Sequence, residues 1–262
     1  MKIAEKSLVY LYCVTQKPPE PKEVENLADK LYFVYTQGLY AVVSRVCPGE
    51  FSKENLKKNL ADLEWVKVRV SLHEKVVEEI MKNACVIPFK FATLFNSEDS
   101  LKLSLEKNAQ VFRENFKKLE GKEEWGVKIY CDLEKLKISL MGQEFLEIDK
   151  QISSASAGKA FFLKKKKEEL LDKAVNKNIN QYGQVSFDRL KEESIETRIN
   201  KLLPKEVTER EDDMILNSAF LVDKSRVGEF AQIADSLKTK YNDNGLNFDF
   251  TGPWPPYNFC AT

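Results

Sequence analysis

The sequence predicts an α+β protein built from two domains, and three observations lead to this prediction. The chain has 262 residues, a length more typical of two domains of ordinary size than of one. Hydrophobic residues make up 43% of the chain, enough to fill a core and to exclude wholesale disorder. A new strand pattern begins at Glu124, after a helix that Gly121 is placed to end. We therefore expect an N-terminal α+β domain over residues 1–120 and a C-terminal domain over residues 124–262.

The first domain is predicted to pack amphipathic helices on a sheet. Leu39–Val46 is apolar on both faces, which is typical of a central strand, and Gln37 and Gly38 before it suit a hairpin turn. Ser97 is a good N-cap for one helix that runs to Gly121, with apolar residues spaced by three and four along one face. The other predicted elements are strands over residues 7–15, 32–35 and 86–95, and helices over residues 24–31, 53–62 and 66–84.

The second domain is predicted to be ferredoxin-like, with an elongated helical insertion. Its expected order is strand, long helix, strand, strand, helix, strand, which is the order of a split βαβ unit. The long helix covers residues 159–203, has a break near residues 181–183 and stops at Pro204. Residues 132–157 are ambiguous. The remaining predicted elements are strands over residues 125–131, 205–210, 214–222 and 246–251, and a helix over residues 225–241.

Composition and motifs argue against most kinds of chemistry. Lys+Arg and Asp+Glu both number 41, and a chain without a basic excess is not built mainly to neutralise nucleic-acid phosphates. Five scattered cysteines without a Cys-x-x-Cys pair favour reduced thiols in the cytosol. His73 is the only histidine, which excludes sites that need several imidazoles, and its place beside an apolar stripe predicts a packed or capping side chain. We expect no catalytic residues, no cofactor, no metal, no nucleic acid and no lipid membrane as partner.

The C-terminal residues 251–259 form the most unusual segment. Three prolines restrict its backbone, and Trp254, Tyr257 and Phe259 place three large aromatic rings close together. A rigid aromatic segment binds a partner with little loss of conformational entropy, so this tail suits an interface. The alternative is that the tail folds back and seals the core of its own domain. Both hold together if Trp254 points inward and Tyr257 or Phe259 points outward.

Several blocks of the chain follow the sequence pattern of one known protein family. The ending Thr-Gly-Pro-Trp-Pro-Pro-Tyr-Asn-Phe is similar to that family's terminal signature. Glu124 to Lys128 matches its Glu-Trp-Gly-Val-Lys strand, and residues 158–163 resemble its Gly-x-Ala-aromatic-Leu helix start. Trp65, His73 and the segment 86–95 follow a third block, in which Ala92 stands where the family usually has Gly. Because Gly alone adopts positive φ cheaply, we expect an ordinary or locally rearranged backbone at Ala92.

On these blocks the chain resembles the gas vesicle GvpF/GvpL family. The resemblance implies a non-enzymatic accessory protein and minor constituent of the gas vesicle. Such proteins are needed for vesicle formation and are thought to bind the very hydrophobic major shell protein; other gas vesicle accessory proteins are further expected partners. Before assembly the apolar surface of the shell protein would aggregate in water, so a soluble protein with an aromatic docking edge would hold it. We expect the docking residues to be Trp254, Tyr257, Phe259, Phe89 and Phe91.

Two other interpretations stay open. One is an assembly scaffold that binds several soluble partners through the charged helical region 159–203. Lys164–Lys167 within it is either a solvated helix face or a contact for an acidic protein surface. The other is an enzyme on a ferredoxin-like scaffold, although the sequence contains no evident nucleophile–base pair.

Overall fold

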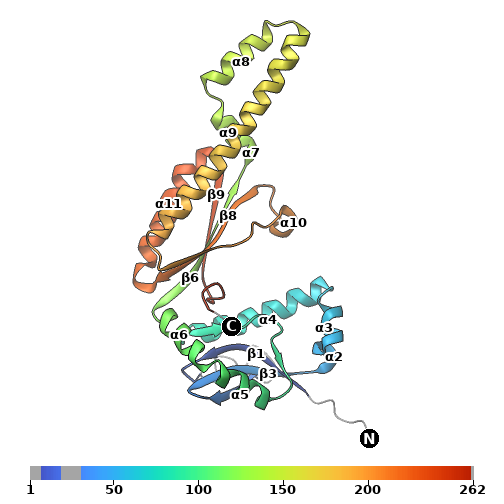
Figure 1. Ribbon diagram of the computed structural model, residues 1–262, viewed down its shortest axis with the longest axis vertical. Coiled ribbons are helices and arrows are strands. Elements are labelled where there is room, and N and C mark those ends of the chain that lie inside the picture. The colour runs from blue at the N-terminus through green and yellow to red at the C-terminus, as the bar shows by residue number, and fades with distance from the viewer. Residues whose placement is uncertain (1–6, 19–30, 261–262) are drawn as a thin grey trace. The chain divides into compact units, whose positions relative to one another are not determined.

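The computed structural model describes residues 7–18 and 31–260, which form two compact units (Figure 1). The first unit comprises residues 1–123 together with 254–262, and the second comprises residues 124–253. The C-terminal tail therefore groups with the N-terminal unit, whereas the predicted boundaries assigned it to the second domain. The helix predicted over residues 24–31 lies almost wholly outside the described residues, and Leu31 begins a strand.

The first unit contains an antiparallel sheet in the order β2-β3-β1-β4, with β5 also paired to β1. At the predicted hairpin turn Gln37 has φ 50° and Gly38 has φ 79°, the two positive angles of a type I′ turn. The central strand β1 is buried on both faces because helices and the chain after β4 cover it. The five strands are β1 Leu8–Thr15, β2 Leu31–Thr36, β3 Leu39–Val46, β4 Val86–Pro88 and β5 Leu94–Phe95.

Five described helices belong to this unit, and their caps explain where they begin. Asp62 accepts hydrogen bonds from the backbone of Glu64 and Trp65 and so starts the longest one. Ser97 and Ser100 form a reciprocal capping box at the start of α5. The single helix predicted from Ser97 to Gly121 is divided into two at Asn108. The helices are α2 Pro48–Phe51, α3 Lys53–Asn59, α4 Leu63–Met81, α5 Glu98–Lys107 and α6 Ala109–Leu119.

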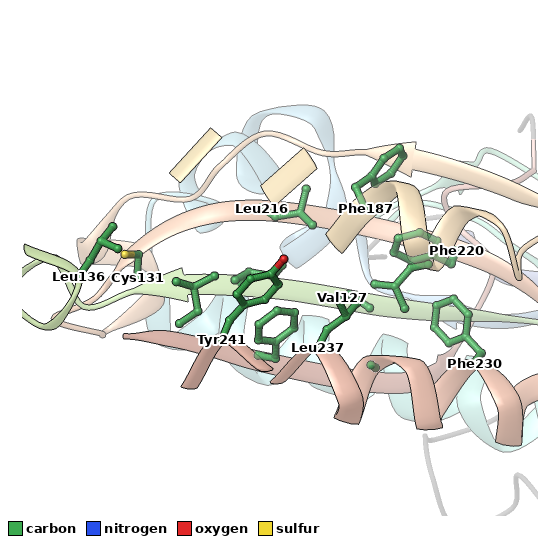
Figure 2. Packing of buried hydrophobic residues seen from close by; sticks show 14 of the residues in the cluster. Val127, Cys131, Leu136, Phe187, Leu216, Phe220, Phe230, Leu237 and Tyr241 are labelled. Atoms are coloured by element: carbon green, nitrogen blue, oxygen red, sulfur yellow. The ribbon is translucent and has the colours of Figure 1, made fainter. Parts of the chain in front are cut away.

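The second unit is a four-stranded sheet in the order β7-β8-β6-β9, with two long helices packed on it (Figure 1). Its order of strands and helices is compatible with a ferredoxin-like arrangement. Figure 2 shows Phe187 of α9 and Phe230 of α11 beside Phe220 of β8, with ring centroids 5.7 and 5.3 Å from that of Phe220. The main elements are β6 Lys122–Cys131, α9 Ala157–Lys191, β7 Glu196–Ile199, β8 Asp213–Asp223, α11 Val227–Tyr241 and β9 Leu246–Trp254.

Two predictions for this unit were wrong. The second strand is Glu196–Ile199, whereas residues Lys205–Thr208 of the predicted strand form the short helix α10. The long helix ends at Lys191 and continues without a break through Gly183, which faces the backbone of β8 at Ile215. The ambiguous stretch is mostly helical. Its elements are α7 Leu133–Leu140 and α8 Gln143–Ser153, and two short 3-10 helices follow later at Lys224–Arg226 and Asn242–Asn244.

Helices α8 and α9 form a hairpin that extends beyond the sheet of their own unit (Figure 1). The buried residues of α9 all lie between Val175 and Leu190, so its N-terminal half is outside the core. Lys167 of α9 binds both carboxylate oxygens of Asp149 on α8 at 2.7 Å and links the two helices.

Candidate functional site

The residues predicted to form the site surround His73 in the first unit. His73 lies on the face of α4 that also buries Val76, Val77 and Ile80, and its side chain is 1% exposed. Its Nδ1 is 2.9 Å from the hydroxyl of Tyr10 on β1. Its Nε2 is 3.0 Å from the carbonyl oxygen of Phe89 and 3.1 Å from the hydroxyl of Tyr257 in the tail. One imidazole therefore joins α4, β1, the chain after β4 and the C-terminal tail.

The protonation of His73 follows from its surroundings. Burial lowers its pKa to about 4, so the imidazole is neutral at pH 7. A carbonyl oxygen only accepts, so Nε2 carries the proton and donates it toward Phe89 and Tyr257. The bare Nδ1 then accepts from the hydroxyl of Tyr10, whose oxygen in turn accepts from the backbone N–H of Ala92 at 3.0 Å. Every polar atom in this chain of hydrogen bonds is used.

The backbone at Ala92 corrects the expectation drawn from its side chain. Ala92 has φ 61°, in the left-handed region that glycine adopts cheaply. This turn divides the predicted strand 86–95 into β4 and β5 and directs the N–H of Ala92 at Tyr10. Ala92 therefore adopts a left-handed conformation although glycine, the residue that usually adopts it, is absent at this position.

The C-terminal tail packs into the first unit. The hydroxyl of Tyr257 donates to a carboxylate oxygen of Glu74 at 3.1 Å, and burial raises the pKa of Glu74. Phe259 is 2% exposed, and the ammonium of Lys118 on α6 donates to its carbonyl oxygen at 2.9 Å. The tail folds back, as one of the two interpretations expected, but onto the N-terminal unit.

A cavity of about 410 Å³ adjoins this network. Tyr10 is one of its walls, so the residue that binds His73 also shapes the cavity. Phe91 is another wall and lies edge-on to His73, with centroids 6.1 Å apart. Arg69 is joined to Glu50 by an ion pair within the lining. The lining consists of Tyr10, Tyr12, Ser44, Arg45, Val46, Cys47, Glu50, Phe51, Arg69, Leu72 and Phe91.

The five predicted docking residues have different positions. Phe89 and Tyr257 meet at His73, Phe91 lines the cavity and Phe259 is buried. Trp254, at the end of β9, is 42% exposed, so the combined interpretation with Trp254 inward is wrong. Sequence reasoning missed Tyr10 and Glu74. The available signal for Tyr10 was its place, together with Tyr12, on a largely apolar strand.

The arrangement around His73 holds structure together. Both ring nitrogens are already hydrogen-bonded, and the hydroxyls of Tyr12 and Ser44 bond to each other at 3.1 Å. Within residues 7–18 and 31–260, no group of three or more His, Cys, Asp or Glu side chains is arranged to hold a metal ion. Over the same residues, every helix is too short or too polar to cross a bilayer.

The fold and this site define a two-unit α+β protein with an aromatic cavity supported by a buried histidine. The family model described as gas vesicle synthesis protein GvpL/GvpF matches residues 8–261, and the chain belongs to this family. The family has a role in gas vesicle formation and is not a known family of enzymes.

Relatives and solved structures agree with this assignment. The chain is 28% identical to gas vesicle protein F of Nostoc sp. (strain PCC 7120) over 261 residues, covering 96% of this chain and 97% of the relative. It is 23% identical to gas vesicle protein L of Streptomyces sp. (strain CB03234), covering 85% and 80%. The crystal structure of GvpF from Anabaena sp. PCC7120 has the same fold, with a TM-score of 0.73 and 22% identity over 98% of this chain and 99% of that one.

Proposed function

We propose that this chain is a minor gas vesicle component that binds the hydrophobic major shell protein during nucleation or assembly. It works at the vesicle in the cytoplasm, alongside other gas vesicle accessory proteins, and breaks no covalent bond. Membership of the GvpL/GvpF family supports this proposal. The observation that carries it is the aromatic cavity of the first unit.

The cavity has the features of a docking pocket for an apolar side chain. Its lining includes Tyr10, Tyr12 and Phe51, each 6% exposed or less. Rings that are already held in place lose little conformational entropy when a partner binds, so the contact area converts efficiently into affinity. The hydrogen bond from Tyr10 to His73 fixes one of these rings.

The five docking residues divide between contact and support in this proposal. Phe91 at the cavity and the exposed Trp254 contact the shell protein. Phe89, Tyr257 and Phe259 hold the surrounding chain in place through His73 and Lys118. Large aromatic side chains at a surface are the usual anchors of protein interfaces.

Capture of the major shell protein from cells that co-express it with this chain tests the proposal. Phe91→Ser and Trp254→Ser should each reduce the captured shell protein, and the effect should persist at high salt because the contact is apolar. Leu103→Ser on α5 is the matched control, since Leu103 is 67% exposed and lies outside the cavity lining. Unchanged capture by the double variant would overturn the proposal. Truncation after Gly252 is a poorer test because it removes the buried Phe259.

The second candidate function is a scaffold that binds several partners through the region 159–203. Exposed lysines at residues 164–166 favour it, because they offer a basic surface to acidic proteins. Reversing their charge should then weaken capture of other gas vesicle accessory proteins, with strong dependence on salt. If neither the charge reversal nor the salt concentration changes the amount of captured accessory protein, this candidate function is excluded.

A further inference from the structure

The tip of the α8–α9 hairpin exposes two adjacent aromatic rings. Phe161 is 65% exposed and Phe162 is 72% exposed, and their ring centroids are 6.0 Å apart. Single exposed apolar residues are ordinary, whereas a pair on a projecting hairpin is a concentrated apolar surface. Burial of an exposed phenylalanine ring is favourable, so this pair offers a substantial driving force for association.

The same hairpin carries a hollow that is suited to these rings. Leu146 on α8 is 54% exposed and lines a depression of about 560 Å³. Glu147 and Asp149 lie beside it and are ion-paired on the same chain, Glu147 with Lys150 and Asp149 with Lys167. Its lining residues are Gln143, Leu146, Glu147, Asp149, Lys150 and Ser153.

The charges of the two helices are opposite. Residues 159–167 of α9 contain five lysines and no acidic residue, whereas α8 contains three acidic residues and one lysine. Only Lys167 among these five is paired, with Asp149. Among the residues that the structure describes, Lys164, Lys165 and Lys166 have no ion-pair partner and are exposed. The basic aromatic strip of α9 thus complements α8, which has an excess of acidic residues and carries the apolar hollow, but both lie on one chain.

We propose that a second copy of this chain docks on the hairpin. In the pair, Phe161 and Phe162 of each copy enter the hollow beside Leu146 of the other, and Lys164–Lys166 face Glu144 and Glu147. With a two-fold axis, the strip of each copy meets the hollow of the other, so both surfaces are covered at once. A partner with only one complementary surface would cover only one of them. The two hairpins then form a short four-helix bundle, a standard way to bury apolar stripes of helical hairpins.

Sedimentation of the full chain over a range of concentrations tests this pairing. Wild type should form dimers that dissociate as salt rises, because part of the attraction is between exposed charges. Phe161→Ser with Phe162→Ser should weaken dimerisation at least tenfold without unfolding, since both rings are exposed. The matched control is Leu63→Ser with Leu103→Ser, two residues of similar exposure on the other unit, which should leave dimerisation unchanged.

Complementary charge reversal distinguishes this interface from any other. Lys164→Glu with Lys165→Glu, and separately Glu144→Lys with Glu147→Lys, should each give monomers, and a mixture of the two variants should restore a dimer. A wild type that stays monomeric up to about 100 μM would overturn the proposal, since that excludes even a weak interface. So would dimers that survive the loss of both phenylalanines, or monomers that bind anionic lipid vesicles through the tip.

Discussion

At the scale of residues, His73 shows how a single polar group can organise an apolar region. Its two nitrogens contact a strand, a turn and the tail, and its own side chain is 1% exposed. A buried hydrogen-bonding group left without its partner costs about 1–3 kcal/mol, so replacing any member affects the others. The sequence predicted that His73 is packed, because it lies beside an apolar stripe. The sequence did not predict the partners, which come from positions up to 184 residues away.

The buried imidazole should make stability depend on pH. The pKa of His73 is lowered to about 4 in the folded chain, against 6.5 for an exposed histidine. Between these values only the unfolded chain binds the proton, so the free energy of unfolding should fall as pH drops from 6.5 toward 4, by up to about 3 kcal/mol. Above pH 6.5 this contribution is constant. Glu74 has the opposite effect on the free energy of unfolding. Because its pKa is raised in the folded chain, the folded chain binds a proton at a higher pH than the unfolded chain does.

Urea unfolding at several pH values measures this dependence. His73→Gln should show a smaller slope over this pH range, and Glu74 is present in both chains, so the difference between their slopes isolates His73. Parallel slopes in the two chains would contradict the assignment.

Ala92 provides a second test at this scale. A left-handed conformation costs an L-residue roughly 1–2 kcal/mol, whereas glycine loses about 0.5–1 kcal/mol through its freer unfolded chain. Ala92→Gly should therefore raise the free energy of unfolding by up to about 1 kcal/mol. Ala61 is the control, because it is not among the described residues with positive φ. Ala61→Gly should lower the free energy of unfolding. A loss of stability in both variants would show that strain at Ala92 is negligible.

At the scale of elements, the sequence predicted well wherever the apolar pattern was strong. The strand Leu39–Val46 has the predicted bounds, and α11 differs only at its start. The edge strand β7 was missed because its residues Glu196, Thr197, Arg198 and Ile199 carry no alternating apolar pattern. An edge strand pairs with a single neighbouring strand. The pairing with β8 therefore determines where β7 forms more than the composition of β7 does.

Gly183 shows a second error at the level of elements. It was predicted to break α9, but the helix continues through it. A Cβ atom at this position would lie 3.6 Å from the carbonyl oxygen of Ile215, which is ordinary van der Waals contact. Gly183→Ala should therefore stabilise the second unit by up to about 1 kcal/mol, the difference in helix propensity. Thermal or urea unfolding measures it. Gly245→Ala is the contrasting variant and should destabilise, because φ is 79° and the Cβ would lie 2.8 Å from the oxygen of Asp132.

At the scale of the whole molecule, the chain leaves the first unit near residue 123 and returns to it at residue 254. No local pattern predicts this return, because the proline-rich tail lacks periodicity and its partners on α4 and α6 lie far away in the sequence. The prolines and aromatic rings of the tail, and then the family resemblance, identified it as distinctive without revealing what it packs against. The docking role of Trp254, Tyr257, Phe259, Phe89 and Phe91 remains a prediction.

Removal of residues 254–262 should destabilise the first unit selectively. The deletion exposes the surroundings of Phe259 and leaves Glu74 and His73 without the hydroxyl of Tyr257. Amide hydrogen exchange should accelerate in β1 and α4, whereas β8 and α11 should keep their protection. Equal acceleration in both units would mean that the two fold as one cooperative body.

The return of the tail also sets the order in which the protein is completed during its synthesis. Tyr257 is separated from His73 by 184 positions, so at about 5–20 residues per second the ribosome delivers it roughly ten to forty seconds later. Throughout that interval the nascent N-terminal unit lacks its last aromatic residues. The part of the protein that is translated first is therefore finished last.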